Sequence, residues 1–288
     1  MVGHRPALRS AYDPRMPLPT PAADRTAVVT GASSGIGREI ARRLAQRGHG
    51  LTLVARREER LRELADELGT VHTGLRMEVV VADLTDAAAR RHIPEAVAER
   101  GLEPSVLVNA AGLSTVGPVH RNDPEAELTM LRTNVEALAH LTSLFLPGMV
   151  ERRRGGLLNV ASTAAFQPLP GQAGYAASKA FVLSYSRAVR EEVRGHGVVV
   201  TVLCPGPVRT EFAETAGFDP AEADSALPSF MWVEASEVAR AAVEGLEHGR
   251  AHVIPGAANR VTAYAAQLVP PTLLTKVLAR QHPGLQGS

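Results

Sequence analysis

The order of short apolar segments and amphipathic helical segments constrains the fold of this chain more than any other feature. Apolar runs of strand length predict β-strands at 27–30, 51–55, 77–81, 106–108, 157–160, 198–203 and 252–254. Helical periodicity predicts helices over 36–47, 58–68, 124–153, 174–194 and 236–247, with Pro147 placed to end or kink the longest. This alternation predicts right-handed βαβ units and a parallel sheet covered on both faces. We therefore expect an α/β fold with one doubly wound, Rossmann-like domain.

The two ends of the chain fall outside this pattern. Residues 1–24 combine arginines with five prolines and lack an apolar core, so we expect a disordered extension over 1–24 rather than a transit peptide. The domain is expected over 25–256. Residues 257–288 read as a broken amphipathic helix around Pro270-Pro271, packed on its own domain or on a second subunit. Contact with a membrane surface is the less favoured reading, because only Lys276 and Arg280 supply positive charge there.

Charge and composition exclude several classes of function. The net charge of +1 favours neither nucleic acid nor an anionic membrane as a partner. No run of about 18 apolar residues occurs, so we expect no membrane span. The histidines lack the spacing of a metal site, so no metal is expected. The single cysteine, Cys204, is compatible with the cytoplasm. We also expect a homo-oligomer.

A glycine-rich turn joins the first predicted strand to the first predicted helix. Its residues, Thr30 to Gly37, read T-G-A-S-S-G-I-G, with the glycines at 31, 35 and 37. Such a strand, turn and helix let backbone N–H groups and the helix dipole meet a pyrophosphate. The turn alone is a weak signal, since a tight connection without a ligand can look the same.

This segment resembles the T-G-x-x-x-G-I-G pattern of the short-chain dehydrogenase/reductase family, and the resemblance extends over residues 26 to about 256. It implies cofactor contacts from the turn, from Asp83-Leu84 after the third strand, and from the N-A-A-G segment after the fourth. For Asn109, a structural role in the sheet is as strongly expected as a ligand role. The cofactor residues expected from these segments are Gly31, Ser33, Ser34, Gly35, Ile36, Gly37, Asp83, Leu84, Asn109, Ala110 and Gly112.

Two arginines after the second strand indicate which dinucleotide is bound. An acidic residue at this strand end favours NAD, whereas an arginine accommodates the 2′-phosphate of NADP. Here the strand ends in Arg56-Arg57, and Glu58 comes only after both. Arg56 is the first expectation for the phosphate contact and Arg57 the second, with Ser33 as a further donor. The alternative is a pair of solvated arginines ahead of a helix. The sequence therefore predicts NADP(H).

A phenol and an ammonium stand four residues apart in Tyr175-Ala176-Ala177-Ser178-Lys179. On a helix, positions i and i+4 share a face, so both groups can point to one reacting centre. We expect the lysine and a positively charged nicotinamide to lower the pKa of Tyr175, which would then exchange a proton with the substrate oxygen. The pair alone is weak evidence, because a solvated helix face gives the same pattern.

Three further segments strengthen the resemblance. Ser162 follows the fifth predicted strand, where its hydroxyl can hold a carbonyl oxygen. The resemblance implies that Asn134 holds a water that relays protons to Lys179. It also implies that the P-G segment after the sixth strand orients the carboxamide. The catalytic residues expected are Asn134, Ser162, Tyr175 and Lys179, and the remaining cofactor contacts are Tyr175, Lys179, Pro205, Gly206, Val208 and Thr210.

Together these segments predict an NADP(H)-dependent oxidoreductase that acts on a small-molecule carbonyl or alcohol, with Tyr175 as the acid and base. The alternative is an NADP(H)-binding regulatory protein without significant turnover. Residues 211–233 should form the substrate loop, and its aromatic and methionine side chains favour an apolar pocket. They could equally pack the loop onto the domain. These side chains are Phe212, Phe218, Phe230, Met231 and Trp232.

Overall fold

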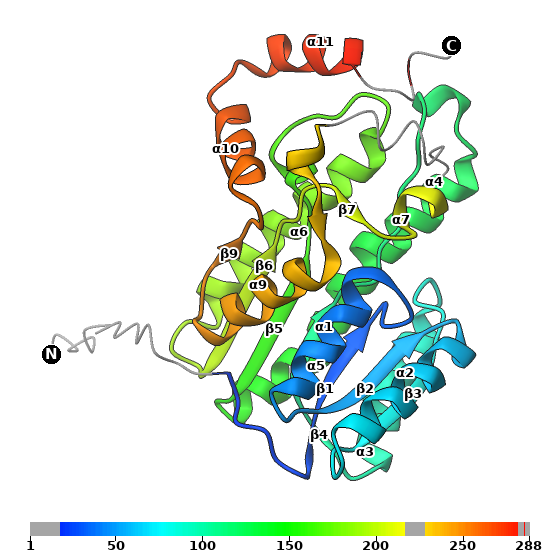
Figure 1. The fold of residues 1–288 in the computed structure, drawn as a ribbon, viewed down its shortest axis with the longest axis vertical. Helices are drawn as coiled ribbons and strands as arrows, with labels where there is room; N and C mark the ends of the chain where they lie inside the picture. Colours follow the sequence, from blue (N-terminus) through cyan, green and yellow to red (C-terminus); the bar gives the residue numbers. More distant parts are fainter. Residues whose placement is uncertain (1–17, 217–227, 282–284, 286–288) are drawn as a thin grey trace, which may run out of the picture.

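Seven parallel strands form the centre of the molecule in the computed structural model, which describes residues 18–216, 228–281 and 285 (Figure 1). Their order in the sheet is β3-β2-β1-β4-β5-β6-β9, so the chain winds outward in both directions from β1 and β4. The strands are β1 (Arg25–Thr30), β2 (Gly50–Ala55), β3 (Met77–Val81), β4 (Glu103–Asn109), β5 (Gly155–Val160), β6 (Val198–Leu203) and β9 (His252–Val253). This confirms the expected doubly wound sheet.

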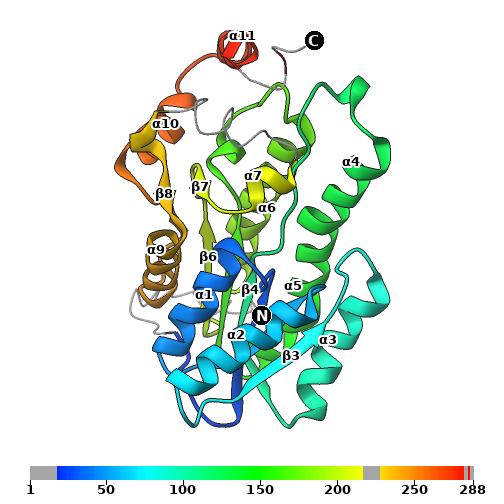
Figure 2. The ribbon, with the colours of Figure 1, turned by 45° about the vertical axis from the view of Figure 1, so that its right-hand side comes forward.

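Helices cover both faces of this sheet, as Figure 2 shows. One buried cluster joins α1, α2 and α9 to the sheet, and a second joins α3, α5 and α6 to the opposite face. Because both faces are covered, the central strands are almost wholly buried, which explains their continuous apolar sequences. These helices are α1 (Gly35–Gln46), α2 (Glu58–Val71), α3 (Ala87–Glu99), α5 (Leu138–Glu151), α6 (Ala173–Glu192) and α9 (Ala235–Glu247).

The long helix expected over 124–153 is not continuous. It consists of α4 (Pro124–Leu131), a π-helical segment η2 (Arg132–Ala137) and α5. Pro147 lies inside α5 and neither ends it nor breaks it, since the helix runs on to Glu151. A π turn widens a helix by one residue and is frequently found at functional sites. Here it contains Asn134, so the interruption coincides with a predicted catalytic residue.

The N-terminal extension packs on the domain from Leu18 onward. Leu18 is buried in the cluster that contains α1 and α9, and the side chain of Arg25 donates to the carbonyl oxygen of Thr20 at 2.9 Å. Residues 18–24 therefore lie against the domain, anchored by an apolar side chain, whereas the sequence predicted a disordered extension over 1–24. Residues 1–17 of that expectation lie outside the described part of the chain.

The C-terminal tail forms two helices, α10 (Ala257–Ala266) and α11 (Pro271–Gln281), which lie beyond the carboxyl ends of the strands (Figure 1). Asn259 is buried and anchors the first of them, because its amide nitrogen donates to Met231 O at 2.9 Å. Met231 belongs to the short turn η4 (Ser229–Met231), which precedes the strand β8 (Val233–Glu234); β8 pairs with β7 (Val208–Arg209). Within residues 18–216 and 228–281, no helix is long and apolar enough to cross a membrane.

Candidate active site

The glycine-rich turn leaves β1 at Thr30 and enters α1 at Gly35, as expected. Gly31 has φ +67°, and a Cβ there would lie 2.8 Å from the backbone of Ala111. A Cβ on Gly37 would lie 2.4 Å from Gly31 O, so both positions require glycine. The first turn of α1 contains no acidic residue and its N-cap, Ser34, makes no side-chain capping bond. The helix N-terminus is thus suited to an anion.

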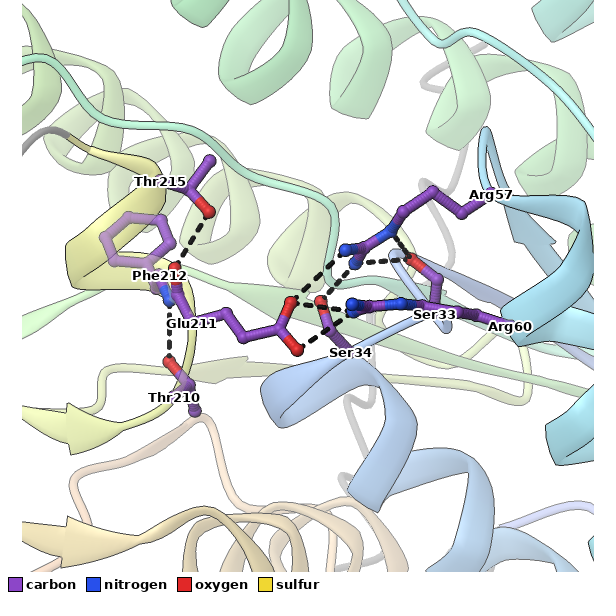
Figure 3. Close-up of polar contacts among 8 residues, drawn as sticks. All are labelled: Ser33, Ser34, Arg57, Arg60, Thr210, Glu211, Phe212 and Thr215. Atoms are coloured by element: carbon purple, nitrogen blue, oxygen red, sulfur yellow. Dashed lines mark hydrogen bonds and ion pairs between the residues drawn. The ribbon is translucent and has the colours of Figure 1, made fainter.

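Arg57, rather than Arg56, holds the two serines of this turn. Its Nε and Nη2 donate to Ser33 Oγ at 3.2 and 3.0 Å, and Nη2 also donates to Ser34 Oγ at 2.7 Å (Figure 3). Arg56 lines the same cavity, and its charge contributes to lowering the pKa of Asp83. Arg57 is thus the arginine that contacts the glycine-rich turn, whereas the sequence favoured Arg56 as the first partner of a 2′-phosphate, and that order stays a prediction.

Asp83 and Leu84 line the cavity at the end of β3. Hydrogen bonds from the backbone and side chain of Thr85 are the main causes that hold the pKa of Asp83 below its usual value, so the carboxylate is ionised. Asn109 is different, because it does not line the cavity. Its Nδ2 donates to Asn159 Oδ1 at 2.9 Å and so links β4 to β5. Of the two roles expected for Asn109, the structural one is supported.

Tyr175 points into the cavity from the first turn of α6. Its ring packs on Phe212, with the centroids 5.8 Å apart and an interplanar angle of 50°. Burial raises the pKa of Tyr175, and a hydrogen bond with Ser162 only partly opposes this. Without a nicotinamide the pKa of Tyr175 is thus raised, and the lowering expected from Lys179 together with a positively charged nicotinamide stays a prediction. The phenol is protonated at neutral pH and can donate a proton.

Lys179 lies one turn further along α6 and is almost wholly buried. Its Nζ donates to Val160 O at 2.9 Å and lies 5.8 Å from the centroid of the Tyr175 ring. Burial lowers the pKa of Lys179 to about 8. A lysine with such a pKa can take up or release a proton near neutral pH, as a proton relay requires.

Asn134 lies behind these residues, outside the lining of the cavity. Its Oδ1 accepts from Leu113 N at 2.8 Å, and its Nδ2 donates to Leu113 O and to Ser178 Oγ. A Cβ on Gly112 would lie 3.3 Å from Lys179 Nζ and 3.4 Å from Asn134 Oδ1. Lys179 and Asn134 therefore both approach the backbone of Gly112. The structure brings the expected tetrad together, with Asn134 as the member that fixes the backbone of residue 113.

Ser162 follows β5 and caps the short turn η3 (Thr163–Phe166), where its Oγ accepts from Ala164 N at 3.1 Å. Its hydroxyl also reaches Pro205 O, at 3.5 Å. This contact ties the serine to the P-G segment that follows β6. Cys204, just before that segment, is buried and burial raises its pKa to about 12, so its thiol is inert.

One cavity of about 920 Å³ connects most of these groups. Except for Asn109 and Asn134, every residue predicted for cofactor binding or catalysis lines it. Phe212, Met231 and Trp232 of the predicted substrate loop line it too, whereas Phe230 is 72% exposed and Phe218 lies outside the described residues. In the part of the chain that the structure describes, no group of three or more His, Cys, Asp or Glu side chains could hold a metal ion.

Several site residues were not predicted from the sequence. Arg60 and Glu211 form ion pairs at the mouth of the cavity, and Arg60 could have been found because it lies one helical turn after Arg57. The tail residues had no local signal, because only the tertiary fold brings them to the cavity. These tail residues are Thr262, Ala263, Ala265, Ala266, Val269, Leu274 and Leu278.

Known proteins resemble both the sequence and this arrangement. A family model described as short chain dehydrogenase matches residues 25–220. The NADP-dependent 3-hydroxy acid dehydrogenase YdfG of Escherichia coli K12 is 39% identical over 188 residues, which are 65% of this chain and 74% of that protein. Sulfoacetaldehyde reductase 2 of Chromohalobacter salexigens is 37% identical over 215 residues, which are 74% of this chain and 84% of that protein.

Among solved structures, a short-chain dehydrogenase from Sphingobium yanoikuyae in complex with NADPH superimposes with a TM-score of 0.74 at 33% identity, over 84% of this chain and 92% of that one. The closed form of a serine dehydrogenase complexed with NADP+ gives a TM-score of 0.68 at 36% identity, over 75% of this chain and 86% of that one.

Proposed function

This chain belongs to the short-chain dehydrogenase family, and from that premise we propose that it moves a hydride between NADP(H) and a carbonyl or alcohol carbon, with Tyr175 as acid and base. The observation that carries the proposal is that Ser162, Tyr175 and Lys179 open into the same cavity as the glycine-rich turn. The alternative, a regulatory protein without significant turnover, would have no use for this placement.

The residues present fit an NADP(H) molecule. The backbone approach at Gly31 and Gly37 and the N-terminus of α1 suit the pyrophosphate, and Arg57 with Ser33 suits the 2′-phosphate. When bound, the dinucleotide supplies or accepts the hydride. The names of the relatives and structures that contain NADP or NADPH support the same choice.

The protein's own groups then handle the substrate oxygen. Ser162 holds this oxygen by a hydrogen bond, and the protonated Tyr175 donates its proton as negative charge develops there. Lys179, with a pKa near 8, can restore that proton, and Asn134 fixes the backbone next to it. Tyr175 gives up its proton when a carbonyl is reduced and takes one up when an alcohol is oxidised.

The substrate that fits best is uncharged and largely apolar. Among the described residues that line the cavity, the charged ones are Arg56, Arg57, Asp83, Lys179 and Glu211. Both arginines and Asp83 lie on the dinucleotide side, and Lys179 Nζ is engaged with Val160 O. A substrate carboxylate or sulfonate beside Tyr175 would be desolvated without a cationic partner, which is costly. Leucine, valine, methionine and tryptophan side chains are available instead.

We further propose that the protein is a cytoplasmic homo-oligomer. Exposed apolar side chains on α4 and α6 support a contact with a second copy. These side chains are Leu128 and Leu131 on α4 and Phe181 on α6, and the Phe181 ring stacks on Tyr185. Sedimentation of the purified chain tests the oligomeric part of this proposal.

Turnover tests the central proposal. Purified protein should oxidise NADPH in the presence of an aryl alkyl ketone, and much more slowly with a keto acid of the same size. Tyr175→Phe keeps the packing on Phe212 but removes the hydroxyl, so turnover should fall at least ~10²-fold. Its NADPH affinity, measured by nicotinamide fluorescence, and its melting curve should stay close to those of the unmutated protein. Near-normal turnover of a folded Tyr175→Phe protein would refute the proposal.

A further inference from the structure

Glu211, which lines the cavity, forms ion pairs with two arginines, Arg57 and Arg60 (Figure 3). Its Oε2 lies 3.2 Å from Arg57 Nη1, and its two carboxylate oxygens lie 2.9 and 2.7 Å from Arg60 Nη1. Arg57 and Arg60 stand at the start of α2, whereas Glu211 precedes the short helix α7 (Phe212–Thr215). The ion pairs therefore join the dinucleotide side of the cavity to the predicted substrate loop.

Arg57 is also the residue that the site geometry assigns to a 2′-phosphate. Its Nε and Nη2 face Ser33 and Ser34, and its Nη1 faces Glu211. A guanidinium has five N–H donors, and the outer ones serve either a carboxylate or a phosphate. Glu211 thus holds part of the donor set that a 2′-phosphate would need.

Glu211 is an anion at neutral pH. Hydrogen bonds from Arg60 first, and then from Arg57, hold the pKa of its carboxyl below the usual value. A 2′-phosphate carries up to two negative charges, so the two anions would repel each other when placed on one guanidinium. Arg60 gives Glu211 a second partner, to which the carboxylate can turn when Arg57 is taken.

We infer that Glu211 competes with the 2′-phosphate of NADP(H) for Arg57 and so lowers the selectivity of the enzyme for NADP(H) over NAD(H). This inference rests on the proposed function, because it presumes that NADP(H) binds in the cavity. NAD(H) has a hydroxyl in place of this phosphate and does not displace the carboxylate. The competition therefore acts on one dinucleotide and not on the other.

The effect is modest, because all three side chains are 39–48% exposed. Exposed ion pairs stabilise weakly and are screened by salt. Replacing Glu211 by glutamine should therefore tighten NADPH by about two- to fivefold at low salt, with NADH hardly changed. The gain should shrink as salt is added.

Binding of each dinucleotide without substrate, followed by nicotinamide fluorescence, tests the inference. The control for Glu211→Gln is Glu58→Gln. Glu58 lies at the start of α2, and its replacement also removes one negative charge, but the ion pair that is lost is with Arg62. The NADPH-to-NADH affinity ratio should rise for Glu211→Gln and stay unchanged for Glu58→Gln. In a protein that already carries Arg57→Ala, Glu211→Gln should no longer raise the ratio.

Two results would overturn the inference. If Glu211→Gln weakens NADPH and NADH equally, Glu211 is a latch that holds the cavity closed over either dinucleotide. If neither affinity changes, the ion pairs are surface contacts without effect on binding. In both cases the unmutated protein still binds NADPH, so the proposed function stands. Failure of the unmutated protein to bind NADPH would overturn the proposed function and this inference together.

Discussion

The hydroxyl of Ser33 accepts two hydrogen bonds from the single guanidinium of Arg57, at 3.2 and 3.0 Å. This fork places Arg57 beside the glycine-rich turn, while the adjacent Arg56 lies nearer to Asp83. Two neighbouring arginines of the same charge thus have different partners. They form a matched pair for testing where a 2′-phosphate is bound.

Replacing Arg57 by alanine should weaken NADPH about tenfold, because a charge-assisted contact at a half-exposed site is lost. Arg56→Ala should cost less, about two- to threefold, since it removes mainly long-range charge. NADH affinity should hardly change in either variant. Dissociation constants from fluorescence titration decide the order, and a larger NADPH loss in Arg56→Ala would restore the order expected from sequence.

The tail should control which substrates enter. Leu278 on α11 lines the cavity, whereas its neighbour Val277 does not and is 43% exposed. Leu278→Trp should therefore lower kcat/KM for a bulky ketone about tenfold, with a smaller loss for a short aldehyde. Val277→Trp adds the same bulk to the outer face and should leave both values unchanged. Equal effects of the two substitutions would show that α11 does not determine substrate specificity.

The imidazole of His49 should make the fold sensitive to acid. It is buried, and burial lowers its pKa to about 4 from an unfolded value near 6.5. Between these values the unfolded chain binds a proton that the folded chain does not, so stability falls as pH drops from about 6.5 towards 4. The loss from this group should reach about 3 kcal/mol.

Urea unfolding at several pH values measures this loss. His49→Gln should flatten the dependence of unfolding free energy on pH below 6.5, while the exposed control His196→Gln should follow the unmutated protein. An unchanged acid limb in His49→Gln would show that other groups cause the acid sensitivity.

Leu18 should contribute to stability although it lies before the first strand. Its Cδ1 lies 2.8 Å from the place that a Cβ on Gly156 would take, so it packs directly on β5. Leu18→Ala should lower the unfolding free energy by about 2 kcal/mol, at the small end for buried leucine, because the site is at the edge of the core. Leu268→Ala, at a position that is 87% exposed, should change it little. Equal midpoints in urea for Leu18→Ala and the unmutated protein would contradict this assignment.

Much of the fold could be predicted from sequence because local patterns determine it. The strands are buried on both faces and so read as continuous apolar runs, and the turn at Gly31 to Gly37 needs glycine for reasons of close approach. Ser162 comes just after β5, and Tyr175 and Lys179 lie near the start of the helix after it, so their positions in the sequence predicted that all three lie at the carboxyl end of the sheet. Each of these signals lies within a few residues of the feature that it predicts.

The features that sequence did not reveal depend on tertiary contacts. The π turn at Asn134 adds one residue to a helix whose apolar periodicity looks continuous. The pKa of Tyr175 depends on burial and on a hydrogen bond with Ser162, and neither is visible in the Y-x-x-x-K spacing. Glu211 meets Arg57 across 154 positions of chain, and no periodicity predicts such a pair.

The cavity walls contributed by α10 and α11 limit how far a substrate can be assigned to one enzyme from the name of a related one. The family model matches residues 25–220, which hold the reacting groups, whereas Val269, Leu274 and Leu278 come after that segment. Two enzymes can thus share the same chemistry through the matched segment and differ in substrate specificity through the last thirty or so residues. High identity over the shared segment predicts the type of reaction. The sequence of the tail has to be compared separately to predict the substrate.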